Sequence, residues 1–150
     1  MSTDTFKVYD AEQMVVGRLG TKVAKAALLG ENIVIINVEK AILTGDPHTI
    51  ISAWKEKFKI RTSYKHDRGP FHERRPDKMV RRMIRGMLPW PTPRGKAAFK
   101  RIKVFIGTPE RYADAEKIVL EKSRYRSMTQ KHIVVLELSR ELGWRHPEVA

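Results

Sequence analysis

The strongest constraint on how this chain folds is the concentration of its positive charge in residues 59–103. That segment holds 15 Lys and Arg residues against three acids, whereas the whole 150-residue chain carries a net charge of +13. The remaining residues, 15 bases and 14 acids, are almost neutral. A block of one sign repels itself, and binding to a polyanion relieves the repulsion and releases counterions. We therefore expect a near-neutral core that carries a basic segment, with nucleic acid as the first candidate partner.

Two other interpretations of the basic segment fit less well. An inert charged surface normally mixes both signs. A helix lying on a membrane needs an unbroken amphipathic stretch, but prolines and glycines interrupt this one, among them Pro76, Gly86, Pro89, Pro91, Pro93 and Gly95. The chain has no run of 18 apolar residues and no cysteine. We therefore expect no membrane partner, no disulfide and no thiolate metal site.

The neutral part of the chain predicts an α/β unit. Residues 7–10 form one short candidate strand, and the continuous apolar run at 33–36 is typical of a strand buried on both faces of a parallel sheet. Between them, apolar residues recur at helical spacing over residues 18–29, and Gly30 is suited to end that helix. The order strand, helix, strand predicts a βαβ unit.

Helical spacing returns on both sides of a polar, basic loop at residues 63–77. Residues 47–60 place apolar side chains on one face, with Trp54 expected in the core. Beyond the loop, two rows of residues four apart form one apolar stripe: Met79, Met83 and Met87 beside Val80, Ile84 and Leu88. The arginines in this region lie off the stripe, so this helix can pack on the core and present guanidinium groups outward.

The rest of the chain predicts shorter elements. We expect a short helix over residues 94–102 and a strand over 103–107. Residues 114–120 are weakly periodic and predict a helix, whereas 132–135 suit a strand or a helix start. A last helix should end near Gly143.

Few residues suggest catalysis. The turn from Gly17 to Gly20 has the form G-x-x-G before a helix, which fits either a phosphate-binding turn or a tight strand-to-helix connection, but it lacks a complete nucleotide-binding motif. The histidines show no metal-ligand spacing, and we expect His66 and His72 to face RNA or solvent. Trp90 is a candidate either for stacking on a base or for covering the domain. We expect no enzyme activity, no metal, no cofactor and no small-molecule substrate.

Several motifs resemble one known family. These are RGMLP at 85–89, the pattern RG-x-x-A with a later V-x-x-G at 94–107, GRLGTKVAKAALLGE at 17–31, IVIINVEKAILTG at 33–45 and ELSRELGW near the end. Together they resemble ribosomal protein family thirteen of the large subunit, in its archaeal and eukaryotic form. Trp90 and its neighbours depart from the family, since more basic residues are usual there.

The resemblance implies an α/β fold, binding to large-subunit ribosomal RNA during assembly, and no catalysis. It assigns RNA contacts to Arg68, His72, Arg74, Arg75, Arg82, Arg85, Arg94 and Lys96. The charge pattern adds further candidates: Arg18, Lys22, Lys65, Arg81, Lys100 and Arg101. We therefore expect one domain over residues 1–150, a three-layer α/β fold whose small, mostly parallel sheet is flanked by helices, with a basic loop-plus-helix extension.

The expected function is that of a structural constituent of the large ribosomal subunit, in the cytoplasm, with ribosomal RNA and neighbouring ribosomal proteins as partners. Two alternatives stay open. A nucleotide-binding α/β enzyme would use the turn at Gly17 to Gly20 and would bind nucleotide even at high salt. A general nucleic-acid-binding protein would bind duplex DNA and structured RNA about equally.

Overall fold

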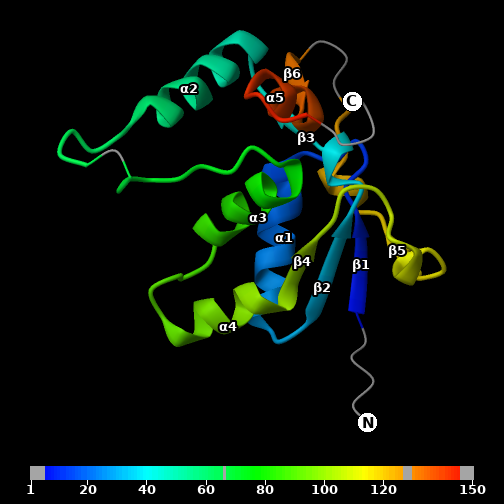
Figure 1. Ribbon diagram of the computed structural model, residues 1–150. Helices are drawn as coiled ribbons and strands as arrows, with labels where there is room; N and C mark the ends of the chain where they lie inside the picture. The colour runs from blue at the N-terminus through cyan, green and yellow to red at the C-terminus, as the bar shows by residue number, and fades with distance from the viewer. Residues whose placement is uncertain (1–5, 66, 127–129, 146–150) are drawn as a thin grey trace.

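A four-stranded parallel sheet forms the centre of the molecule (Figure 1). The computed structural model describes residues 6–65, 67–126 and 130–145. Its helices and strands, in chain order, are β1 (Phe6–Asp10), α1 (Val16–Leu28), β2 (Asn32–Ile36), β3 (Ile42–Thr44), α2 (Pro47–Lys59), α3 (Pro76–Gly86), α4 (Pro93–Arg101), β4 (Ile102–Val104), β5 (Lys117–Ile118), β6 (His132–Val134) and α5 (Val135–Glu141).

The strand order of the main sheet is β4-β2-β1-β5. In β2, Ile33, Val34, Ile35 and Ile36 are all completely buried, which confirms the prediction of a strand covered on both faces. Alternate side chains enter different clusters, because successive residues of a strand point to opposite faces. Ile33 and Ile35 pack toward the helices, whereas Val34 and Ile36 pack against Tyr112 on the other face.

Helices α1, α3 and α4 cover one face of the sheet (Figure 1). On the other face, Tyr112 lies in a short 3-10 helix and packs with Val8, Phe6 and Phe105. The predicted α/β fold, with a mostly parallel sheet flanked by helices, is confirmed. In the part of the chain that the structure describes, no helix combines the length and the apolar character needed to cross a bilayer.

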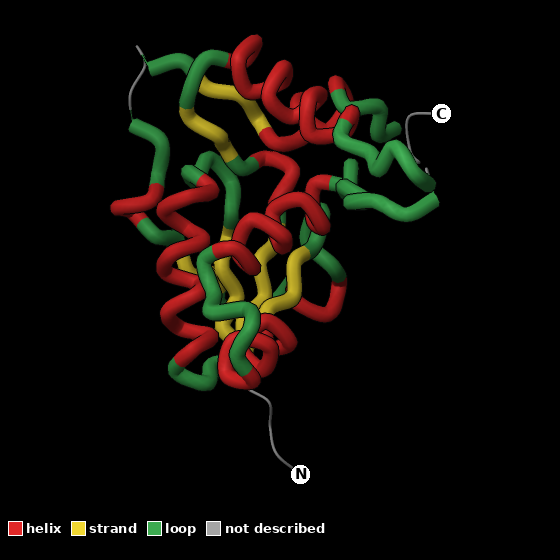
Figure 2. The backbone as a smooth tube through the Cα atoms, turned by 90° about the vertical axis from the view of Figure 1, so that its left-hand side faces the viewer, coloured by secondary structure: helices red, strands yellow, loops and turns green. Residues whose placement is uncertain are grey.

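A second, smaller layer lies beyond the carboxyl ends of the main strands (Figure 2). Here β3 and β6 form an antiparallel pair, and α2 and α5 pack beside it. Trp54 of α2 packs against this cluster but is only partly buried, and no residue of α2 is fully buried, so Trp54 lies at the edge of the core rather than inside it as predicted. Met79 of α3 is part of the same cluster, whereas Val80 and Ile84 belong to the main core. Helix α3 therefore joins the two layers.

Three segments differ from the sequence-based expectations. The helix predicted over residues 114–120 is wrong, because β5 pairs there with β1, Val8 opposite Lys117 and Tyr9 opposite Ile118. This tertiary pairing outweighs the weak local helical pattern. The strand predicted over 103–107 already ends at Val104, and Gly107 has a φ of 64°. The short strand β3 had not been predicted.

Candidate RNA-binding surface

Helix α3 separates an apolar face from a basic one. It begins at Pro76, which suits the first helical position, and Asp77 complements the helix dipole in its first turn. Its inward residues Met79, Val80 and Ile84 are almost completely buried. On the outward side, four basic residues follow one another at helical spacing: Lys78, Arg81, Arg82 and Arg85. The predicted amphipathic helix is confirmed, except that Met87 of the predicted stripe lies beyond the end of α3 and is exposed.

The turn from α3 to α4 depends on a close backbone contact at Gly95. A Cβ atom on Gly95 would lie 2.0 Å from the carbonyl oxygen of Pro89, so only glycine fits this position. The hydroxyl of Thr92 donates to that same carbonyl at 2.8 Å and accepts from the Gly95 amide at 3.2 Å, which caps α4. The RGMLP motif and the downstream Arg-Gly pair are therefore two sides of one contact, which fixes how α4 leaves α3.

Two arginines of α3 lie on aromatic rings supplied by the turn and by α4. The guanidinium of Arg81 lies 4.5 Å from the ring centre of Phe99, and that of Arg85 lies 4.9 Å from the ring of Trp90. The two rings themselves meet edge to face at 5.1 Å and 85°. We call these four residues the arginine–aromatic cluster. Cation–π contacts of this kind restrict each guanidinium before any ligand arrives.

Two neighbouring hollows open beside this cluster. One, of about 250 Å³, is lined by Glu73, Lys78, Arg81, Arg82, Arg85 and Phe99. The other, of about 400 Å³, is lined by Asp77, Lys78, Arg81, Lys100, Lys103, Val104 and Phe105. We call their basic side chains (Lys78, Arg81, Arg82, Arg85, Lys100 and Lys103) the α3–α4 basic face. Each hollow holds four bases and one acid, so the positive sign dominates locally.

The loop between α2 and α3 extends this basic surface. The ring centres of His72 and Phe58 lie 5.5 Å apart, and the guanidinium of Arg74 lies 5.2 Å from the ring centre of Phe58. Arg82 of α3 donates to the carbonyl of Phe71 at 3.2 Å. Tyr64 is 96% exposed. The loop therefore carries an exposed aromatic side chain among bases and is attached to both α2 and α3.

The other predicted residues fall into three groups. Arg18 and Lys22 are exposed on α1, Lys65 and Arg68 in the loop, and Arg94 and Lys96 in the first turn of α4. Two arginines are held by the protein itself: Arg75 forms two 3.0 Å hydrogen bonds to Asp77, and Arg101 donates to the carbonyl of Ala27 at 3.3 Å. His66 lies outside the described residues.

Sequence reasoning missed Lys78 and Lys103 of the α3–α4 basic face. Lys78 carried a usable signal, since it lies three residues before Arg81 on the predicted helix. Lys103 lies on β4, and only the tertiary structure brings it to the hollow beside α3.

Comparisons with known proteins identify the family. Residues 4–111 match the family model of ribosomal protein L13. The chain belongs to the ribosomal protein L13 family. "Large ribosomal subunit protein uL13" of Methanopyrus kandleri is 44% identical over 96% of this chain and 91% of its own length. The proteins of the same name from Archaeoglobus fulgidus and Methanocaldococcus jannaschii are 40% and 42% identical, over 95% and 91% of this chain and 90% and 96% of their own lengths. The family is structural rather than enzymatic.

In this chain, backbone hydrogen bonds cross the place where similar α/β enzymes bind a nucleotide. In this strand order the crevice for a nucleotide lies between β1 and β5, at the carboxyl ends of the strands. Here the Tyr125 amide donates to the Gln13 carbonyl at 2.9 Å, and the Val15 amide donates to the Ser123 carbonyl at 2.9 Å. The backbone of residues 13–15 and 123–125 therefore closes this crevice. Gly20 serves packing, because a Cβ there would lie 2.8 Å from the sulfur of Met87.

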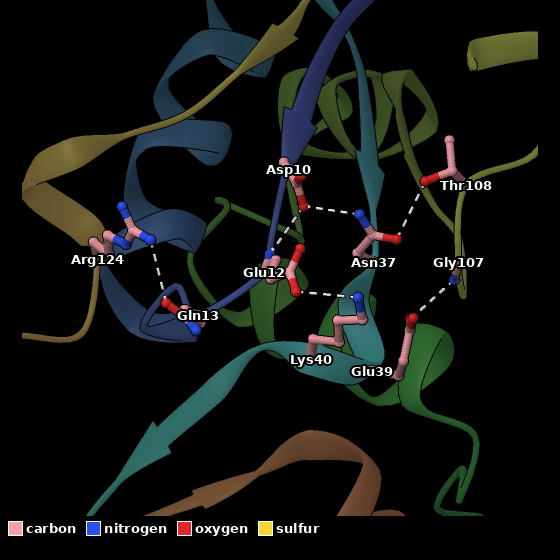
Figure 3. A network of polar contacts seen from close by, with 9 residues as sticks. All are labelled: Asp10, Glu12, Gln13, Asn37, Glu39, Lys40, Gly107, Thr108 and Arg124. Atoms are coloured by element: carbon pink, nitrogen blue, oxygen red, sulfur yellow. Dashed lines mark hydrogen bonds and ion pairs between the residues drawn. The ribbon is translucent and has the colours of Figure 1, made fainter.

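Polar residues at the carboxyl edge of the sheet form a network in which acids and amides are paired (Figure 3). Asp10 accepts from the side-chain amide of Asn37 and from the backbone amide of Glu12, both at 3.0 Å. Glu39 accepts from the Gly107 amide at 2.9 Å, and Lys40 donates to Glu12 at 3.1 Å, which raises the pKa of Lys40. Among the described residues, no group of three His, Asp or Glu side chains could hold a metal ion.

Proposed function

We propose that this chain is a structural constituent of the large ribosomal subunit in the cytoplasm and binds large-subunit ribosomal RNA through the α3–α4 basic face and the adjoining loop. The observation that carries the proposal is the arginine–aromatic cluster, in which Arg81 and Arg85 are held on Phe99 and Trp90 beside two basic hollows. Membership of the L13 family supports the ribosomal context.

Arginine suits this role because its planar fork bonds phosphate oxygens in two places. Guanidinium groups that are already restricted lose less conformational entropy when RNA binds. RNA helices are recognised through phosphates, 2′-hydroxyls and shape. The chain would therefore hold RNA segments in fixed relative positions while neighbouring ribosomal proteins pack on its other surfaces, and this would assist assembly.

Replacing four exposed bases by glutamine tests the proposal. The face variant changes Arg82 and Lys100 of the α3–α4 basic face together with Arg94 and Lys96, two predicted contacts beside it on α4. A charge-matched control changes Arg111, Lys117, Lys122 and Arg140, which lie outside the basic segment. Binding to large-subunit RNA fragments is titrated with salt. We expect the face variant to lose about 0.7 to 0.9 units of log–log salt slope for each phosphate contact removed. Equal losses in both variants would contradict a defined face.

Duplex DNA of equal charge, used as competitor, tests the general nucleic-acid-binding alternative. The proposed function requires the parent protein to prefer the RNA fragments, because A-form geometry and 2′-hydroxyls distinguish RNA from DNA. Equal affinity for DNA would favour the alternative and would leave only non-specific electrostatic binding.

A further inference from the structure

The guanidinium of Arg81 differs from the other arginines of α3 in its surroundings. Its Nε atom is buried and has no hydrogen-bond partner among the described residues. A buried donor without a partner costs free energy, and native structures rarely leave one without a reason. Its Cζ atom lies 4.5 Å from the ring centre of Phe99, so the ring holds this group in place although the hydrogen bond of its Nε atom is not made.

The acids near Arg81 are already paired with other bases. Glu73 lies 3.5 Å from Lys78, and Asp77 forms its two hydrogen bonds with Arg75. Within the described part of the chain, Arg81 therefore has a charge that no carboxylate offsets, although it lines both hollows of the α3–α4 basic face. An anion that reached it would meet a partly desolvated cation, where electrostatic attraction is stronger than in bulk water.

We propose that Arg81 is the anchor of a phosphate-binding subsite, in which one backbone phosphate of the bound RNA is held by Arg81 with Lys78, Arg85 and Lys100 around it. When a neighbouring side chain moves aside, the phosphate oxygens can accept the hydrogen bond that the protein leaves unmade at the buried Nε atom. Lys78 borders both hollows, and its flexible side chain is half exposed, so it can shift to admit the ligand. The inference rests on the proposed function, because it assumes that RNA covers this face.

Replacing Arg81 by methionine separates this role from a structural one. Methionine keeps an apolar contact with Phe99 and removes the buried donor, so we expect the melting temperature of the free protein to be unchanged or raised. RNA affinity should fall by about tenfold or more, as expected for a lost hydrogen bond to a charged group. The salt slope should fall by about 0.7 to 0.9 units, which corresponds to one phosphate. A lower melting temperature with unchanged RNA affinity would overturn the proposal.

Two further variants provide controls. Arg82→Met removes the same charge from an exposed arginine of α3 that donates to the Phe71 carbonyl, and should weaken binding only a few-fold, as expected for an exposed contact. Arg81→Lys keeps the charge without the planar fork, and its affinity should stay well below that of the parent. Equal losses for Arg81→Met and Arg82→Met, or full affinity in Arg81→Lys, would overturn the subsite.

The nitrogen-15 resonance of the Arg81 side chain distinguishes RNA phosphate from free phosphate. We expect an RNA fragment to shift this resonance, and inorganic phosphate at equal ionic strength to shift it far less. A shift with inorganic phosphate but none with RNA, or no shift with either, would overturn the proposal. The face variant retains Arg81, so its unchanged RNA affinity would contradict the proposed function itself. If instead the face variant loses affinity while Arg81→Met behaves like Arg82→Met, only the subsite fails.

Discussion

Polar side chains at the carboxyl edge of the sheet are bonded to groups of the same chain, whereas the arginines on the α3–α4 basic face lack carboxylate partners among the described residues. At the edge, Asp10, Glu12 and Glu39 all accept hydrogen bonds from groups of the same chain. On the α3–α4 basic face, Arg81 and Arg85 lie on aromatic rings and have no ion pair with a described carboxylate. Paired polar groups fasten loops to the fold, whereas unpaired cations are stabilised when an external anion arrives. The hydrogen bonds of the first region are made within the chain, whereas the second region keeps cations available, as the proposed RNA binding requires.

The largest expected effect comes from a substitution that changes the angle between α3 and α4. We expect Gly95→Ala to lower the free energy of unfolding by about 3 kcal/mol, because the new Cβ meets the backbone of Pro89, which cannot rotate away. RNA binding should weaken as well, since Phe99 would no longer lie beneath Arg81. Urea denaturation and RNA titration measure the two effects.

Gly86→Ala is the matched control for that substitution. A Cβ on Gly86 meets nothing within 4 Å, although it also lies in the basic segment, at the end of α3. The added methyl group should stabilise the protein by about 0.4 to 1 kcal/mol, because it reduces the freedom of the unfolded chain. Similar losses for both variants would show that the close contact at Gly95 is not the cause.

Substitutions in the edge network should lower the stability of the protein without changing its RNA affinity. Asn37 has a φ of 54° and bonds to both Asp10 and Thr108. Asn37→Ala should cost about 2 kcal/mol, through backbone strain and lost hydrogen bonds. Asn37→Gly relieves the strain, so it should cost about 1 kcal/mol. Thermal melts measure both values, and RNA affinity should equal that of the parent. A loss of RNA affinity in these variants would mean that the edge also contributes to binding.

A smaller effect should follow from removing one ring of the arginine–aromatic cluster. Phe99→Leu keeps the charge and most of the buried volume, so stability should fall by about 1 kcal/mol. RNA affinity should fall a few-fold at unchanged salt slope, because Arg81 is no longer held in place. Phe99→Tyr restores the ring and should restore affinity. If leucine binds RNA as well as phenylalanine does, restriction of Arg81 contributes nothing to binding.

The sequence predicted the regular helices and the buried strand because their patterns are local. The apolar stripe through Val80 and Ile84 is visible from helical spacing alone, and β2 is visible as a short continuous apolar run. The contact of Phe99 with Arg81 depends on the angle between two helices, which a close approach at Gly95 sets, and no local period reveals it. The mistaken helix over residues 114–120 has the same origin, since a strand of two residues exists only through its partner.

Tertiary contacts were equally invisible from the sequence at the candidate site. The basic segment was visible from charge alone, and it supplied Arg81, Arg82 and Arg85. Charge could not show that Arg75 is already paired with Asp77, or that Arg101 bonds to the end of α1. Whether a cation is engaged by the protein depends on tertiary neighbours, and this decides how much attraction remains for RNA.

The smallest effect concerns an exposed ion pair in the second layer, where Asp46 caps α2 and Lys131 donates to it at 2.8 Å. The hydrogen bond from Lys131, followed by that from the Thr49 amide, lowers the pKa of Asp46. A carboxyl whose pKa is lower in the folded state stabilises the fold above its ordinary pKa, and this stability is lost as pH falls through the folded-state value.

Asp46→Asn keeps a capping oxygen and removes the charge. Its melting temperature should therefore be slightly below that of the parent at pH 7, and the difference should shrink as the pH falls below the ordinary pKa of an aspartate. Lys131→Met removes the partner of Asp46, so its melting temperature should show the same pH dependence relative to the parent. A difference that persists at low pH would assign the effect to the shape of the cap rather than to the charge. Neither variant should alter RNA affinity, because this pair, like the edge network, is satisfied within the chain.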